Sequence, residues 1–226
     1  AGSETATYDA GLRQYMLGVY NYMTGGVALT GVVADIMANM LTLETLMGLH
    51  MPFFIAMLAY AFLVLPRITK MSVQGAQLAF WGYTALVGGL ISALIKVYSG
   101  LDVTRAFLVT TGMFAGLSLY GYTTKKDLSA MGSFLIMGAW GLLLTLVVNA
   151  FFFQSAGVHY AMCLLGVGIF AGLTAYETQN IRRTYYMVAG SAELATKTAI
   201  IGALALYSSF LNIFIFLLQL MGGRGE

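Results

Sequence analysis

The chain has 226 residues, of which 59% are hydrophobic and only 9% are charged, whereas a soluble domain carries about 25% charged residues. This composition excludes a soluble globular domain. The net charge of +2 comes without a basic patch, which argues against a nucleic-acid-binding protein. Glycine is abundant, with 27 residues against 2 prolines, as is usual in membrane helices. The sequence therefore predicts an all-α integral membrane protein.

Seven segments are apolar over roughly the 20 residues that a membrane-spanning helix needs. They are expected at about 17–38, 51–66, 77–97, 103–122, 131–153, 158–176 and 199–221. The second begins at Pro52, and proline suits the first turn of a helix. We therefore expect an N-terminal segment over residues 1–16, followed by a transmembrane domain over residues 17–226.

The orientation follows from the basic residues, because Lys and Arg favour cytoplasmic loops. If the N-terminus is cytoplasmic, eight of the 11 Lys and Arg face inward: Arg13, Arg67, Lys70, Lys125, Lys126, Arg182, Arg183 and Lys197. The other three, Lys96, Arg105 and Arg224, face outward. The bias predicts an N-in, C-out topology, with Glu177 at the cytoplasmic end of the sixth span.

The chain contains an internal repeat two helices long. Residues 112–120 read GMFAGLSLY and residues 168–176 read GIFAGLTAY, which match at six of nine positions. Two spans restore the same orientation, so this would be a parallel repeat; convergence of membrane composition is the alternative. Both copies carry Gly-xxx-Gly, as Gly112 with Gly116 and Gly168 with Gly172. This spacing lets helix backbones approach closely and predicts packing between the fourth and sixth spans.

Glu177 is the leading candidate for a functional residue. In the repeat it takes the place of Gly121, so one copy has a carboxylate where the other has a neutral residue. Burial disfavours its charged form, whereas a nearby Arg182 or Arg183 favours it. Arg67, at the cytoplasmic end of the second span, is a further candidate partner. The plainer alternative is an interfacial glutamate that is solvated or bonded to an arginine.

Polar residues also occur within the last span. Ser209 lies roughly 15 Å into that helix, at 1.5 Å per residue, and it either serves a pathway or bonds its own backbone. Asn212 and Asn149 are expected to bridge helices. No nucleophile and base, nucleotide loop or zinc motif is recognisable, so we do not expect an enzyme, a cofactor or a firm metal site.

Four segments of the sequence are specific enough to indicate a protein family. Residues 20–23, 121–128, 170–181 and 206–212 make the chain resemble the Bax inhibitor family in its bacterial branch, over nearly its whole length. The resemblance implies a bacterial inner-membrane protein with a bundle of seven transmembrane helices, in which a central last helix is surrounded by six. Some members look like pH-sensitive calcium leak channels.

The family's proposed sensor is a pair of aspartates, and this chain departs from it. By the resemblance, the first position is Glu177 and the second is Ser209, which has no carboxylate. Two nearby carboxylates would increase each other's proton affinity, and that effect is absent here. Glu177 alone is a weak Ca²⁺ ligand, since Ca²⁺ takes six to eight oxygens. We expect weaker interaction with Ca²⁺ and a shifted or lost pH switch.

Three functions stay open from the sequence. The first is a cation leak channel with an incomplete acidic pair, for which Ca²⁺ is a transported or weakly bound ion. The second is a protein that transports nothing and instead modulates a membrane protease or another large membrane complex through its N-terminal segment. The family resemblance implies this function, because some bacterial relatives resemble such modulators. The third is a structural subunit of a larger membrane assembly. The partners are then the lipid bilayer and one such complex, but no nucleic acid.

Overall fold

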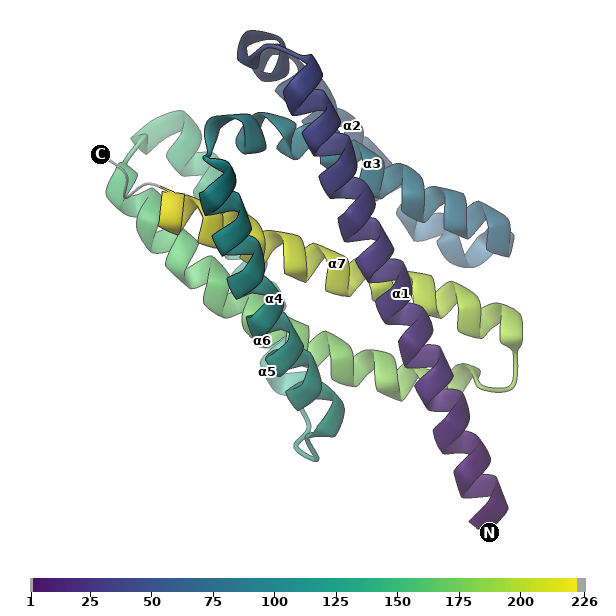
Figure 1. Cartoon of the computed structure of the whole chain (residues 1–226). Coiled ribbons are helices and arrows are strands. Elements are labelled where there is room, and N and C mark those ends of the chain that lie inside the picture. The colour runs from purple at the N-terminus through teal and green to yellow at the C-terminus, as the bar shows by residue number, and fades with distance from the viewer. Residues whose placement is uncertain (1, 223–226) are drawn as a thin grey trace. The chain divides into compact units, whose positions relative to one another are not determined.

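A computed structural model describes residues 2–222, and within them the chain is helical, without strands (Figure 1). The seven α-helices are α1 (Gly2–Met40), α2 (Leu43–Leu63), α3 (Val73–Val97), α4 (Gly100–Thr123), α5 (Ser129–Val148), α6 (Ala156–Val188) and α7 (Ala192–Gly222). A short 3₁₀ helix, η1 (Leu65–Lys70), follows α2, and a π-helical turn, η2 (Asn149–Phe153), follows α5. The all-helical prediction is confirmed for this part of the chain.

Six of the described helices are long and apolar enough to cross a membrane: all except α4. Helix α4 forms where the fourth span was expected, but Asp102, Arg105 and several threonines lower the hydropathy of its apolar stretch. Its 24 residues still measure about 36 Å at 1.5 Å per residue. The count of seven spans and the topology therefore stay predictions.

Helix α2 begins earlier than the sequence indicated. Thr42 caps its N-terminus, because the side chain of Thr42 accepts a hydrogen bond from the backbone N–H of Thr45 at 3.3 Å. Pro52 consequently lies inside α2 instead of in its first turn, which corrects the expected boundary. Proline is tolerated inside membrane helices, where neighbouring groups can satisfy the backbone carbonyl that it leaves unbonded.

Helix α6 continues well beyond the expected end at residue 176. It ends at Val188, and the turn that follows contains Gly190. Glu177 is therefore a residue of the helix interior, about 16 Å from its C-terminal end at 1.5 Å per residue. The cause is residues 184–188, Thr-Tyr-Tyr-Met-Val, whose apolar and aromatic character lets the helix run on past the two arginines.

Contacts divide the chain into two compact units. Unit 1 comprises residues 1–99 and 181–207, and unit 2 comprises residues 100–180 and 208–226. In unit 1, α3 packs against both α1 and α2. A buried polar contact joins α1 to α7, because the Thr30 and Tyr207 hydroxyls lie 2.6 Å apart and Thr30 also donates to the Thr84 carbonyl. This network satisfies polar groups that would be costly to leave unbonded within a bilayer.

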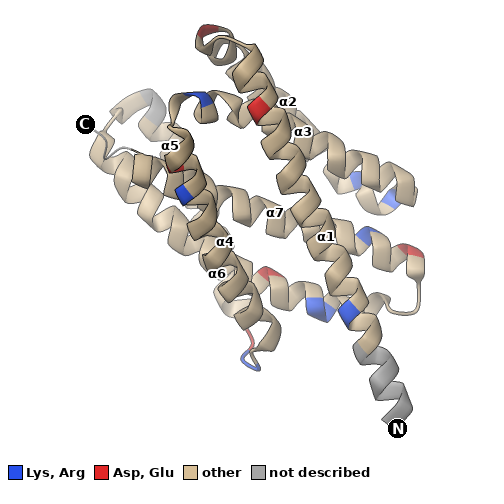
Figure 2. Ribbon diagram, viewed as in Figure 1, with Lys and Arg blue, Asp and Glu red and all other residues tan. Residues whose placement is uncertain are grey.

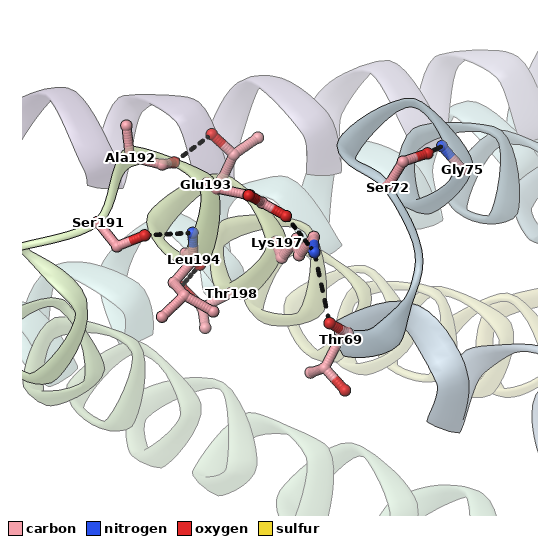
Figure 3. A network of polar contacts seen from close by, with 10 residues as sticks. Thr69, Ser72, Gly75, Ser191, Ala192, Glu193, Leu194, Lys197 and Thr198 are labelled. Carbon is pink, nitrogen blue, oxygen red and sulfur yellow. Dashed lines mark hydrogen bonds and ion pairs between the residues drawn. The ribbon is translucent and has the colours of Figure 1, made fainter.

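A second polar contact in unit 1 fixes the start of α7. The Lys197 side chain is only 8% exposed and bonds to Glu193 at 2.6 Å and to the carbonyl of Thr69 at 3.4 Å (Figure 3). A buried ammonium group is stable only with an opposite charge and hydrogen-bond acceptors around it. Lys197 finds both, and its bonds connect the first turns of α7 to the end of η1.

The core of unit 2 is aromatic and aliphatic. Phe210 of α7 packs edge-on against Phe107 and Phe114 of α4, with ring centroids 5.8 and 5.6 Å apart. The turn between α5 and α6 is closed by Asn149, whose side chain bonds to the backbone of Ser155 at both its N–H and its carbonyl. Asn149 thus stabilises a local turn, which corrects the expectation that it bridges distant helices.

Lys, Arg, Asp and Glu occur mainly towards helix ends and turns, and the helix middles are largely uncharged (Figure 2). Helix α7 has the most buried apolar stretch of the six candidate spans, with 67% of its residues buried. The central position of the last helix stays a prediction.

Candidate functional site

Glu177 and Ser209 lie side by side in unit 2. The Ser209 hydroxyl donates a hydrogen bond to Glu177 Oε2 at 2.7 Å. Ser209 is only 1% exposed and Glu177 is half-buried. A carboxylate that accepts an O–H bond at this distance has a strong, charge-assisted bond. The two positions singled out by the family resemblance thus meet, and Ser209 bonds to α6 instead of to its own backbone.

A cavity of about 280 Å³ lies next to Glu177. Glu177 and Asn212 are its polar lining residues, and the remainder come from α5 and α6: Ile136, Ala139, Trp140, Leu143, Phe170 and Leu173. Ionisable residues within membrane helices usually face the bundle interior or a water-filled cavity, and they mark ion or proton pathways.

Asn212 lines this cavity without bridging two helices. Its side-chain amide donates to the carbonyl of Ser208, four residues earlier in α7, at 2.8 Å. The expected helix-to-helix bond of Asn212 is therefore corrected to a bond within α7. Its side-chain oxygen is not the acceptor or donor in that bond, so it can act as an acceptor at the cavity.

The two residues after Glu177 each contact another part of unit 2. The hydroxyl of Thr178 lies 3.1 Å from that of Ser118 on α4. Gln179 is 2% exposed; it donates to the carbonyl of Lys126 at 2.8 Å and accepts from the N–H of Leu128 at 2.9 Å. Gln179 therefore holds the α4–α5 loop through two backbone groups, the carbonyl of Lys126 and the N–H of Leu128.

The preceding residue, Tyr176, packs against α5. A Cβ on Gly132 would lie 2.3 Å from the Tyr176 ring, so only glycine allows this approach. Successive residues of a helix point about 100° apart, which is why four residues in a row can reach four neighbours. Sequence reasoning missed the roles of Thr178 and Gln179; the available signal was two polar residues beside Glu177 in an otherwise apolar helix.

The arginine candidates have mixed outcomes. Arg67 is exposed and donates to the carbonyl of Leu63 in its own unit. Arg182 also belongs to unit 1, where it is half-buried and has interactions of its own. A contact of Arg67 or Arg182 with Glu177 stays a prediction.

The glycine motif packs differently from the expectation. A Cβ on Gly112, Gly116 or Gly168 would meet no atom within 4 Å, so these three do not pack closely against a described neighbour. Gly172 does, because a Cβ there would lie 2.5 Å from a Leu135 methyl group. The close approach of α4 to α6 is made instead by Gly121, where a Cβ would lie 2.2 Å from the carbonyl oxygen of Ala175.

Among the side chains that the structure describes, no group of three or more His, Cys, Asp and Glu could hold a metal ion. Glu177 with the Ser209 hydroxyl and the Asn212 amide oxygen offers fewer oxygens than the six to eight that Ca²⁺ takes. The arrangement can accept a proton or contact a passing cation, but it does not form a calcium cage.

Comparisons with known proteins agree with the resemblance. The family model described as "Inhibitor of apoptosis-promoting Bax1" matches residues 12–226. An uncharacterized protein of Rickettsia prowazekii is 39% identical over 99% of this chain and 95% of its own length. Inner membrane protein YbhL of Escherichia coli is 38% identical over 95% of this chain and 94% of its own length. An uncharacterized protein of Deinococcus radiodurans is 40% identical over 94% of this chain and 92% of its own length.

Proposed function

Because the chain belongs to the Bax inhibitor family of membrane proteins, we propose that it is a passive cation leak pathway of the inner membrane, in which Glu177 is the ionisable group. The observation that carries this proposal is the Ser209–Glu177 hydrogen bond of 2.7 Å beside a cavity of about 280 Å³. An ionisable residue inside a membrane helix is costly unless it has a partner or a water-filled cavity. Glu177 has one hydrogen-bond partner and one neighbouring cavity.

The proposed chemistry uses both protonation states of Glu177. When ionised, its carboxylate accepts the Ser209 O–H bond and attracts a cation to the cavity through the second oxygen. When protonated, the carboxyl group is neutral and no longer attracts a cation. With Ser209 in place of a second acid, one proton alone controls the local charge, so the response to pH should be shallow.

In this proposal Ca²⁺ or H⁺ is the transported ion, and it binds only weakly at Glu177 on its way through the membrane. Conduction requires binding that is favourable enough for entry and weak enough for exit, and a single carboxylate with two neutral oxygen groups fits that requirement. The proposal includes the N-in, C-out topology with α4 as a seventh span, which is supported by the excess of Lys and Arg in the loops assigned to the cytoplasm.

Removing the charge of Glu177 tests the proposal. In liposomes that contain the purified protein, Ca²⁺ and H⁺ flux should be measurable from pH 6 to pH 8. Glu177→Gln should lower this flux about tenfold, which corresponds to ~1.4 kcal/mol in the barrier, because a neutral amide cannot attract the cation. Glu44→Gln, which removes an exposed carboxylate in the first turn of α2, should leave the flux unchanged.

An equal flux in the wild type and Glu177→Gln would contradict the role of Glu177. No flux in any variant would instead favour the alternative function, a protein that binds and modulates a membrane protease or another membrane complex without transport. In that case the bound partner should co-purify equally with the wild type and with Glu177→Gln.

A further inference from the structure

A second cavity lies in unit 1 and is lined by the first half of α2 and the second half of α3. Its volume is about 330 Å³, within the range of about 300–1,000 Å³ that is typical of ligand sites. Helix α2 contributes three side chains to the lining: Met47, His50 and Met51. The other lining residues come from α3 and the residue after it: Leu90, Ala93, Leu94, Val97 and Tyr98. Two thioethers and one imidazole therefore share a mainly apolar cavity.

The spacing of these three side chains places them on one face of α2. His50 is three residues after Met47, and Met51 is four residues after Met47. Residues three and four apart on a helix are neighbours, with Cβ atoms about 5–6 Å from each other. Methionine is unbranched and flexible, so its sulfur can adjust to a shared partner. One ion can thus be reached by two sulfurs and one imidazole nitrogen.

The type of ligand selects the class of ion. Methionine widens the ligand set beyond His, Cys, Asp and Glu, because its thioether sulfur binds soft ions such as Cu(I), and imidazole also suits copper. Hard cations such as Ca²⁺ and Mg²⁺ need several oxygen ligands, but among the described lining residues the Tyr98 hydroxyl is the one side-chain oxygen. Zn²⁺ is bound by Cys, His, Asp and Glu, of which this lining has only His50. The set therefore fits Cu(I) best.

The two methionine side chains are not taken up by packing in the protein core. Met47 is 61% exposed and Met51 is 55% exposed, and His50 is exposed as well. A Cβ on Gly48, between them in the sequence, would meet no atom within 4 Å, so this stretch of α2 is open. An ion can therefore reach the sulfurs and the imidazole without displacing other side chains.

The place of the cavity along α2 brings it near the polar end of that helix. Thr42 caps α2 and Glu44 lies in its first turn. The three ligands follow Thr42 by about 8–14 Å, at 1.5 Å per residue. Lys96, in the last turn of α3, does not line the cavity, and its ammonium donates to the carbonyl of Ala38 at 2.6 Å. A cation therefore meets no positive charge among the described lining residues.

We propose that Met47, His50 and Met51 form a binding site for Cu(I), with two thioether sulfurs and one imidazole nitrogen as ligands. Binding involves no oxidation or reduction, so Ag⁺, which is also soft and monovalent, serves as a probe. The proposal goes beyond the cation pathway and is independent of it, because every residue that carries it belongs to unit 1 and the Glu177 site belongs to unit 2.

Calorimetric titration of the full chain with Ag⁺ in neutral detergent tests the proposal. Met47→Leu, Met51→Leu and His50→Gln should each weaken Ag⁺ binding about tenfold, or ~1.4 kcal/mol. Leucine and methionine are similar in volume, so the variants should keep their fold, which melting temperatures check. Met57→Leu is the matched control, because it makes the same change on α2 at a residue outside the cavity lining, and it should bind Ag⁺ as the wild type does.

The buried thiol of Cys163, 3.7 Å from the His159 ring, is a competing soft ligand in unit 2. The titrations are therefore repeated in Cys163→Ser, which should keep the silver site of α2. Loss of Ag⁺ binding in Cys163→Ser would assign the ion to the thiol and overturn the proposal.

Three further results would contradict a soft-metal site on α2. The first is Ag⁺ binding that Met47→Leu, Met51→Leu and His50→Gln leave unchanged. The second is Zn²⁺ binding as tight as that of Ag⁺. The third comes from X-ray absorption of the chain loaded with Cu(I), which should show sulfur and nitrogen around the metal; a shell of nitrogen and oxygen alone would exclude the two thioethers.

Discussion

Ser209→Asp is expected to raise Ca²⁺ flux at pH 8 about tenfold over the wild type and to make the flux fall steeply towards pH 6. The Ser209 hydroxyl is 2.7 Å from Glu177 Oε2, so the variant places a second carboxylate against the first. Two carboxylates this close share a proton instead of both staying ionised at lower pH. At higher pH the pair offers Ca²⁺ more of the hard oxygen ligands that it prefers.

The measurement is Ca²⁺ efflux from liposomes at several pH values between 6 and 8. Ser208→Asp is the control, because it adds the same charge one residue earlier, about 100° around the helix and away from Glu177. If Ser208→Asp and Ser209→Asp change the flux equally, general surface charge would explain the effect and the pairing with Glu177 would not.

Gly121→Ala is expected to destabilise the protein by about 1–3 kcal/mol, the usual cost of overpacking. The added Cβ would lie 2.2 Å from the carbonyl oxygen of Ala175, and a backbone oxygen within a helix cannot move aside as a flexible side chain can. Thermal unfolding in detergent, followed by loss of helical signal, should show a lower melting temperature.

Gly112→Ala is the matched control on the same helix, because a Cβ there meets no atom within 4 Å. Alanine favours a helix over glycine by up to about 1 kcal/mol, so this variant should be as stable as the wild type or slightly more stable. A similar loss of stability in both variants would contradict the close approach of α4 to α6 at Gly121.

Most of the helices could be predicted from the sequence because each contains an apolar run of roughly the 20 residues that a membrane span needs. The boundaries could not, since they depend on local details. Thr42 caps α2 before the apolar run begins, and residues 184–188 continue α6 past the two arginines. An apolar segment shows which residues must avoid water, but a helix also extends through polar residues at either side of the membrane.

The candidate site was predictable only in part. A glutamate within an apolar run is visible in any reading of the sequence, so Glu177 could be singled out from its surroundings. The family resemblance pairs the position of Glu177 with that of Ser209, 32 residues away, but it did not predict the hydrogen bond between them. Hydropathy does not show which helices face each other. For the same reason the Gly-xxx-Gly motif indicated which helix surfaces lack side chains, but it did not indicate which helix packs there. The glycine that contacts Ala175 is Gly121, which lies outside the motif.

A double-mutant cycle on cation flux tests the central claim, that Glu177 and Ser209 act as a pair. Flux is compared in the wild type, Glu177→Gln, Ser209→Ala and the double variant at pH 7. Ser209→Ala should lower the flux about threefold to tenfold, because the ionised carboxylate loses its hydrogen-bond donor. In the Glu177→Gln background the same change should have no effect, which gives a coupling energy of about 0.7–1.4 kcal/mol. Equal effects of Ser209→Ala in both backgrounds would mean that the two residues act independently and would contradict the account.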